Sequence, residues 1–158
     1  MVLPLPVSRL VILGVGVLLL AGWVLWIRHR RIARRAAYWS GKVPMSDTDF
    51  LAHFAPITAP QQRFCVAVRK AIAADMDVDA QVVRPDDLIN DYLSLDYTGP
   101  LSLAGVEVMK LELGLKPDEN FVAGQELQEE GPYLGSRTLG DYVTFYLKNW
   151  DRITSPRG

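Results

Sequence analysis

The chain has 158 residues and a formal net charge of −1, but its charges are unevenly distributed. The first 35 residues hold 6 basic and no acidic residues, and the rest hold 11 basic and 18 acidic ones, so the balance is +6 against −7. An acidic remainder argues against nucleic-acid binding, which needs a basic surface to meet the phosphates. The single cysteine, Cys65, excludes an internal disulfide and a thiolate zinc cluster.

An apolar run from Leu10 to Ile27 holds 18 residues without a charge. Roughly 20 helical residues, at about 1.5 Å each, cross the ~30 Å hydrocarbon core of a bilayer, so this run predicts a single transmembrane helix. A cleaved signal peptide is the alternative. It fits less well, because it would place basic residues before a shorter apolar core and small residues after it.

The arginines around this run predict its orientation. Arg9 precedes the run and five arginines follow within eight residues, so the positive-inside rule places the N-terminus outside and the rest in the cytoplasm. For a bacterial source this is a single-pass inner-membrane protein. The arginines expected to contact anionic membrane lipids are Arg28, Arg30, Arg31, Arg34 and Arg35. The expected segments are an external N-terminus (1–9), the transmembrane helix (10–27), a basic juxtamembrane segment and linker (28–45), a cytoplasmic helical domain (46–150) and a tail (151–158).

Two helices are predicted in the first half of the 46–150 domain. Ser46 begins a capping box with Asp49, and Pro56 ends the short helix that follows. Pro60 occupies a favoured first-turn position of a longer helix that runs to about Asp75. Its apolar side chains, spaced i, i+4, i+7 and i+8, predict one buried stripe: Phe64, Val68, Ala71 and Ile72. Its basic side chains are expected on other faces: Arg63, Arg69 and Lys70.

An acidic connection and two further helices follow. Residues 75–96 hold seven aspartates between regularly placed apolar residues, which predicts an ordered loop packed on a core. Ser102 is the expected N-cap of a helix that ends before Gly114, and the acidic segment after it is expected to hold one short helical turn. Thr138 and Asp141 form a capping box before the clearest amphipathic helix. The predicted fold class is all-α, with one transmembrane helix and a bundle of about four helices.

The order of these segments resembles the acyl carrier protein family. Residues 83–96 (VRPDDLINDYLSLD) look like the family's acidic, leucine-punctuated loop. Residues 101–118 look like its second helix and exit, and residues 138–149 (TLGDYVTFYLKN) are similar to its last helix. The resemblance covers about residues 60–150 and implies a small acyl-carrier-like helical domain. In that family a serine at the start of helix two, preceded by an aspartate, carries a phosphopantetheine arm.

The sequence departs from the family at the site of this arm. Asp96 matches the family's aspartate, but Tyr97 follows it, and a phenol cannot replace the modified serine. Ser102 comes only after the inserted residues 97–101 and has a simpler explanation as a helix cap. The resemblance therefore leaves two alternatives open: a domain without a cofactor, or a carrier with 4′-phosphopantetheine on Ser102 or, less favoured, on Ser94.

The sequence contains no pattern typical of a catalytic site. Cys65 falls in the apolar pattern of its helix and is expected to be a buried residue without a catalytic role. Residues 75–86 offer oxygen ligands at positions 1, 3, 5 and 12 of a calcium loop, but Ala80 stands where the turn needs glycine. A solvated acidic face explains the same residues. We therefore expect neither an enzyme nor a metal site.

The predicted function is that of a membrane-anchored, non-catalytic interaction module that presents an acidic surface to a basic partner protein. Charge complementarity of this kind mainly sets the encounter rate and the choice of partner. The residues expected at this surface are Asp86, Asp87, Asp91, Asp96 and Glu107. One alternative is a functional tethered carrier, with the arm on Ser102, that serves a membrane acyl-transfer or lipid pathway. Another is a small accessory subunit that acts through its transmembrane helix.

Overall fold

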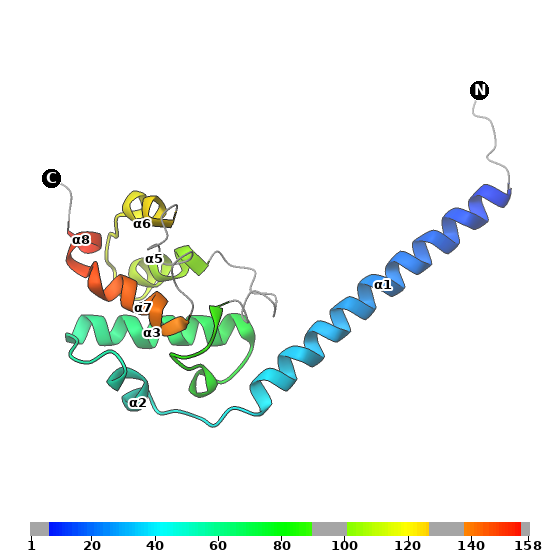
Figure 1. The fold of residues 1–158 in the computed structure, drawn as a ribbon. Coiled ribbons are helices and arrows are strands. Elements are labelled where there is room, and N and C mark those ends of the chain that lie inside the picture. Colours follow the sequence, from blue (N-terminus) through cyan, green and yellow to red (C-terminus); the bar gives the residue numbers. More distant parts are fainter. Residues whose placement is uncertain (1–6, 90–100, 127–137, 156–158) are drawn as a thin grey trace. The chain divides into compact units, whose positions relative to one another are not determined.

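A computed structural model describes residues 7–89, 101–126 and 138–155, and the side chains in these ranges from residue 14 on except at 31, 35, 101–103 and 126. The helices are α1 (Val7–Ser40), α2 (Asp47–Ala52), α3 (Ala59–Met76), the 3₁₀ helix η1 (Ala80–Val82), α5 (Leu101–Leu111), α6 (Glu119–Glu126), α7 (Leu139–Lys148) and α8 (Trp150–Thr154) (Figure 1). Over these ranges the chain forms no strand beyond one isolated bridge between Leu88 and Thr138, in agreement with the all-α prediction. The chain divides after Ser40 into two compact units, which are described separately.

The prediction of a transmembrane segment is wrong. Among the described residues, no helix combines the length and the apolar character needed to cross a membrane. The apolar run lies within α1 and ends at Ile27. Exposed arginines follow it directly, at Arg28 and Arg30. Three further predictions depended on this segment and are wrong for the same reason: the single-pass topology, the external N-terminus and the inner-membrane location.

The second unit begins with two capped helices. Ser46 caps α2 as predicted, because its Oγ accepts a hydrogen bond from the backbone N–H of Asp49 at 3.1 Å. α3 begins one residue before Pro60, and its N-cap is Thr58, whose backbone N–H donates to Oε1 of Gln61 at 2.8 Å. Proline is tolerated there because the first N–H groups of a helix have no partner within the helix.

The core of the second unit forms where α3 packs against α5 and α7. Phe64 of α3 is fully buried, with its ring 5.3 Å from that of Tyr146 and 5.5 Å from that of Trp150. Val68 and Ile72 are buried on the same face of α3, as predicted. The predicted stripe is wrong in one member, since Ala71 is exposed.

α5 and α7 approach each other closely at Gly105. A Cβ atom at this position would lie 2.4 Å from Cζ of Tyr146, so any larger residue would force the two helices apart. The backbone N–H of Gly105 also donates to the hydroxyl of Tyr142 at 2.7 Å. Thr138 begins α7 with the predicted capping box, in which its Oγ1 accepts from the N–H of Asp141 at 3.1 Å.

Two boundaries differ from the prediction. α5 begins at Leu101, so Ser102 lies in its first turn and is not the N-cap, and the side chain of Ser102 is not among those described. The segment expected to hold one helical turn contains all eight residues of α6. Asp118 caps α6 by accepting from the N–H of Phe121 at 3.1 Å, and its own N–H donates to the carbonyl of Ile153 in α8 at 2.9 Å. α6 is thus held by a contact with α8 that its own sequence does not reveal.

Candidate functional site

The described part of the acidic loop is tied to the helices on both sides of it. Asp77 ends α3 in the left-handed conformation (φ 53°), and Asp79 caps η1 by accepting from the N–H of Gln81 at 2.9 Å. Further along, the backbone N–H of Gly140 donates to the carbonyl of Pro85 at 2.6 Å, and the backbone N–H of Leu139 donates to the carbonyl of Asp87 at 2.9 Å. These bonds confirm, for residues 77–89, the prediction of an ordered loop packed on a core.

The structure divides the residues predicted for the acidic surface into three groups. Asp86 and Glu107 are exposed. Asp87 is 5% exposed, forms an ion pair with Lys42, and accepts from the backbone N–H of Arg84 at 2.8 Å. Asp87 therefore holds the loop in place and adds no exposed carboxylate. Three predicted positions lie outside the described residues: Asp91, Asp96 and Ser94.

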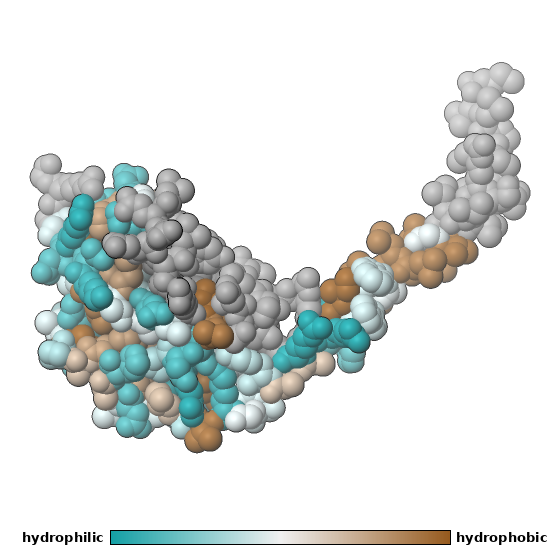
Figure 2. Space-filling model, viewed as in Figure 1, coloured by the Kyte–Doolittle hydropathy of each residue, from teal (hydrophilic) through white to brown (hydrophobic). Residues whose placement is uncertain are grey.

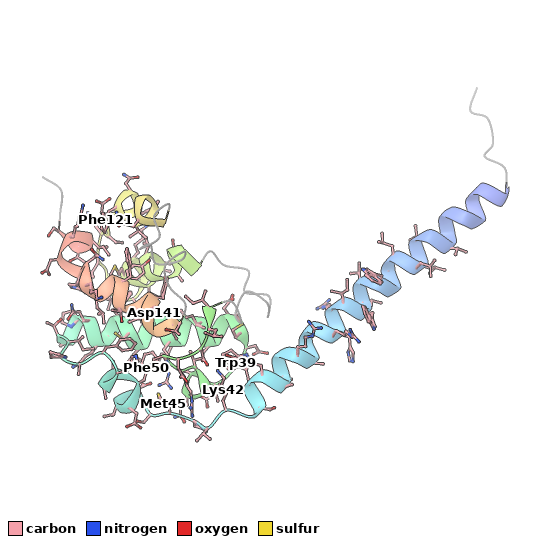
Figure 3. All side chains as sticks on the ribbon, in the orientation of Figure 1. Trp39, Lys42, Met45, Phe50, Phe121 and Asp141 are labelled. Carbon is pink, nitrogen blue, oxygen red and sulfur yellow. The ribbon has the colours of Figure 1, made fainter. Side chains whose placement is uncertain are left out.

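The structure also shows a buried charge that the sequence pattern missed. Arg69 is 0% exposed, although its helical position predicts an outward direction. Its guanidinium fits there because oxygen atoms from two stretches of chain, residues 45–47 and 81–83, surround it. Nε donates to Val83 O at 3.0 Å, Nη1 to Asp47 Oδ1 at 2.7 Å, and Nη2 to Met45 O at 2.8 Å and Gln81 O at 3.0 Å. Met45, Lys42 and Phe50 lie on this same side of α3 (Figure 3), and the guanidinium stacks over the Phe50 ring at 4.6 Å.

A groove of about 820 Å³ lies on another side of α3, between α3 and α5, which run in opposite directions (Figure 1). Its surface is mostly apolar, and three small residues of α3 spaced i, i+4 and i+7 line it: Ala67, Ala71 and Ala74. Val108 and Leu111 line it from α5. The alanine spacing was visible in the sequence, but only the packing of α5 beside it turns the alanines into a groove.

Charged residues border this groove on both helices. Arg63, Lys70 and Asp75 lie along α3, Glu107 lies on α5, and Glu112 directly follows the last residue of α5. All are exposed. Lys110 of α5 does not line the groove and forms an ion pair with Glu119, and this contact raises the pKa of Lys110. The α5 side of the groove is therefore acidic.

The one cysteine of the chain is buried in α3. Burial raises the pKa of the Cys65 thiol to about 12, so at neutral pH it is protonated and unreactive, which agrees with the prediction of a buried structural cysteine. In the described ranges, no three His, Cys, Asp or Glu side chains stand where they would hold a metal ion. Two residues of the calcium-loop pattern in the sequence are helix caps in the structure: Asp77 is the C-cap of α3 and Asp79 is the N-cap of η1. A largely apolar groove bordered by a few charges is the usual form of a binding site.

No protein-family model matches this chain, and no curated protein or solved structure matches it. The resemblance to acyl carrier proteins is therefore carried by the sequence pattern alone.

Proposed function

We propose that the unit from residue 41 on is a non-catalytic, acyl-carrier-like binding module that presents an acidic surface to a basic partner protein. The observation that carries this proposal is the pair of exposed carboxylates, Glu107 and Glu112, along the α5 side of the apolar groove. A partner segment with apolar side chains, and with basic residues on the side that faces Glu107 and Glu112, would match both features at once.

The two features contribute differently to binding. Apolar anchors that fill a groove supply most of the affinity of an interface. Exposed charges at its border mainly raise the association rate, and salt screens them over about 8–10 Å at physiological ionic strength. The proposal therefore predicts a complex whose association rate falls with added salt and whose dissociation rate changes much less.

Site-specific photo-crosslinking in living cells tests this function. A photoreactive amino acid replaces Leu111 at the border of the groove in the full chain, and the control places it at Ala123, an exposed residue of α6 that does not line the groove. We expect a basic protein to be captured at position 111 and not at 123, and we expect the double change Glu107→Lys with Glu112→Lys to abolish the adduct. Equal capture at both positions, or an adduct that survives the charge reversal, would contradict the proposal.

A second candidate function is the carrier with a phosphopantetheine arm on Ser102. One observation favours it: Ser102 lies in the first turn of α5, the helix that forms one side of the groove. Treatment with a phosphopantetheinyl transferase and coenzyme A, followed by intact-mass measurement, tests it. A gain of one phosphopantetheine that disappears in Ser102→Ala would establish the carrier, and an unchanged mass would exclude it.

A further inference from the structure

We infer that the occupant of the α3–α5 groove is an amphipathic helix of a partner protein, with basic residues along one edge of its apolar face and acidic residues along the other edge. The basic edge faces Glu107 and Glu112, and the acidic edge faces Arg63 and Lys70. The inference rests on the proposed function, because it takes the same groove and the same partner, and it deepens that function by naming the kind of segment that docks.

The surface of the groove favours a helix as its occupant. The small side chains of Ala67, Ala71 and Ala74 line it along α3, so a third helix could approach closely and place its apolar side chains between α3 and α5. An extended segment would need partners for its own backbone N–H and C=O groups. The sides of two helices supply few, because helical backbone groups bond within their own helix. A docked helix satisfies these groups internally.

The α3 border of the groove carries two exposed cations in one row. Arg63 and Lys70 are seven residues apart, which places them about 20° apart around the helix axis and about 10 Å apart along it. Asp75 also lines the groove, but it lies about 140° around α3 from Lys70 and so does not belong to this row. An occupant therefore meets positive charge along this border.

The other border carries the opposite sign. Glu107 and Glu112 line it and are exposed, and the nearby Lys110 does not line the groove and is paired with Glu119. A helix with two basic edges would place one of them against the cations of α3, and a helix with two acidic edges would place one of them against the glutamates. Only a helix whose edges differ in sign avoids both repulsions, so the two borders together specify its charge pattern.

The N-terminal helix of this chain does not meet that specification. α1 exposes large apolar side chains, for example Leu18 at 73% (Figure 2), but its residues 7–40 include no aspartate or glutamate. It could offer a basic edge and not an acidic one. The charges of the groove therefore select a segment of another protein over a second copy of α1.

Selection from a library of helices tests the charge pattern directly. The probes are displayed variants of a small helical scaffold protein, in which one surface helix of about 14 residues, about 21 Å long, is varied. Leucines form its apolar face, and each flanking position is either glutamate or lysine. On the immobilised full chain we expect enrichment of probes with glutamate on one edge and lysine on the other. Ala71→Glu, within the groove, should abolish this enrichment, and Ala123→Glu, an exposed position of α6 outside it, should not.

Fluorescence anisotropy of one enriched probe with the full chain then measures the role of the α3 border. Arg63→Glu with Lys70→Glu reverses this border and should weaken binding about 10-fold. A probe with lysine on both edges should bind the wild type about 10-fold more weakly than the enriched probe does, and should regain this loss on the reversed variant. Tight binding of that second probe also shows that the variant is folded.

A second double variant controls for net charge. Lys116→Glu with Lys148→Glu changes the charge of the chain by the same amount at two exposed residues that do not line the groove. Both affinities should stay within about 2-fold of their wild-type values at physiological ionic strength, because salt screens distant charges. An equal loss in the two double variants would overturn the inference, since net charge and not the border would then determine affinity.

The edges of the enriched probes separate the inference from the proposed function. If both edges are basic and Ala71→Glu abolishes the enrichment, the inference fails and the proposed function stands. If both edges are acidic, or if Ala71→Glu leaves the enrichment unchanged, both fail.

Discussion

Two sides of α3 differ in which kind of residue is buried. On one side a charged residue, Arg69, is fully buried because carbonyl and carboxylate oxygens surround its guanidinium. On the other side a small apolar residue, Ala71, is exposed because nothing of this unit covers it among the described residues. At these two positions the burial of a side chain depends on the hydrogen-bond acceptors or covering side chains around it, and not on its own polarity. The Arg69 side of α3 is closed by hydrogen bonds, and the Ala71 side lines the groove.

The largest expected effect comes from breaking the closed side at its centre. Arg69→Ala removes the donor that reaches Val83 O and Met45 O, and a buried acceptor without a donor costs about 1–3 kcal/mol. We expect a loss of about 3–5 kcal/mol in the free energy of unfolding, measured by urea denaturation. Lys70→Ala, at the exposed neighbouring position, should stay within about 0.5 kcal/mol. A loss below about 1 kcal/mol in Arg69→Ala would show that water replaces the guanidinium.

The next effect compares two adjacent aspartates. Asp87→Ala removes the carboxylate that Lys42 and the N–H of Arg84 contact, which should cost about 2–3 kcal/mol. Asp86→Ala changes an exposed side chain and should cost less than about 0.5 kcal/mol. Thermal unfolding of both variants under one buffer condition measures the difference. Equal losses of stability in the two variants would mean that the carboxylates stabilise the local turn and that the ion pair with Lys42 contributes little.

A smaller effect is expected where α5 meets α7. Gly105→Ala places a Cβ atom against the Tyr146 ring, and overpacking of this kind costs about 1–3 kcal/mol. Gly124→Ala in α6 meets no atom within 4 Å and should stabilise the unit by up to about 1 kcal/mol through helix propensity. Chemical denaturation of both variants tests this. A loss of stability in Gly105→Ala and a gain in Gly124→Ala would support the close contact between Gly105 and Tyr146. A stabilising Gly105→Ala would contradict it.

The smallest effect is expected on the open side. Ala71→Leu adds a side chain to an exposed position in the groove and should change stability by less than about 0.5 kcal/mol. Ala73→Leu makes the same change at a position that is 3% exposed and should cost about 1–3 kcal/mol. The pair is compared by urea denaturation at one temperature. If both variants lose the same stability, the groove is packed more tightly than its shape indicates.

The sequence predicted the features that depend on neighbouring residues. The caps at Ser46 and Thr138 and the buried positions of Phe64 and Val68 follow from spacing within one helix. Arg69 escaped prediction because its acceptors lie up to 24 residues away in the chain, and helical periodicity assigns a charged residue to the surface. The apolar run of α1 was interpreted from its composition as a transmembrane segment, and the structure does not support that interpretation.

The candidate site was predicted only in part. Glu107 was identified as an exposed acidic residue, but Asp86 and Asp87 are indistinguishable in sequence, and only the structure shows that Asp87 is buried against Lys42. The groove arises from the packing of two helices whose sequences are separated by a long connection. Periodicity within either helix cannot show which of its faces the other leaves uncovered.

The contacts made by residues 42–45 determine where this protein can be divided. Lys42 pairs with Asp87, the carbonyl of Val43 accepts from Arg84, and Met45 bonds to Gln81 through its N–H at 2.8 Å. The stretch before α2 is therefore an integral edge of the fold, although it contains no helix of its own. A truncated protein for crystallisation should start at Gly41, because a start at Ser46, the first residue with a recognisable cap, would remove all three anchors and leave Arg69 without one of its acceptors.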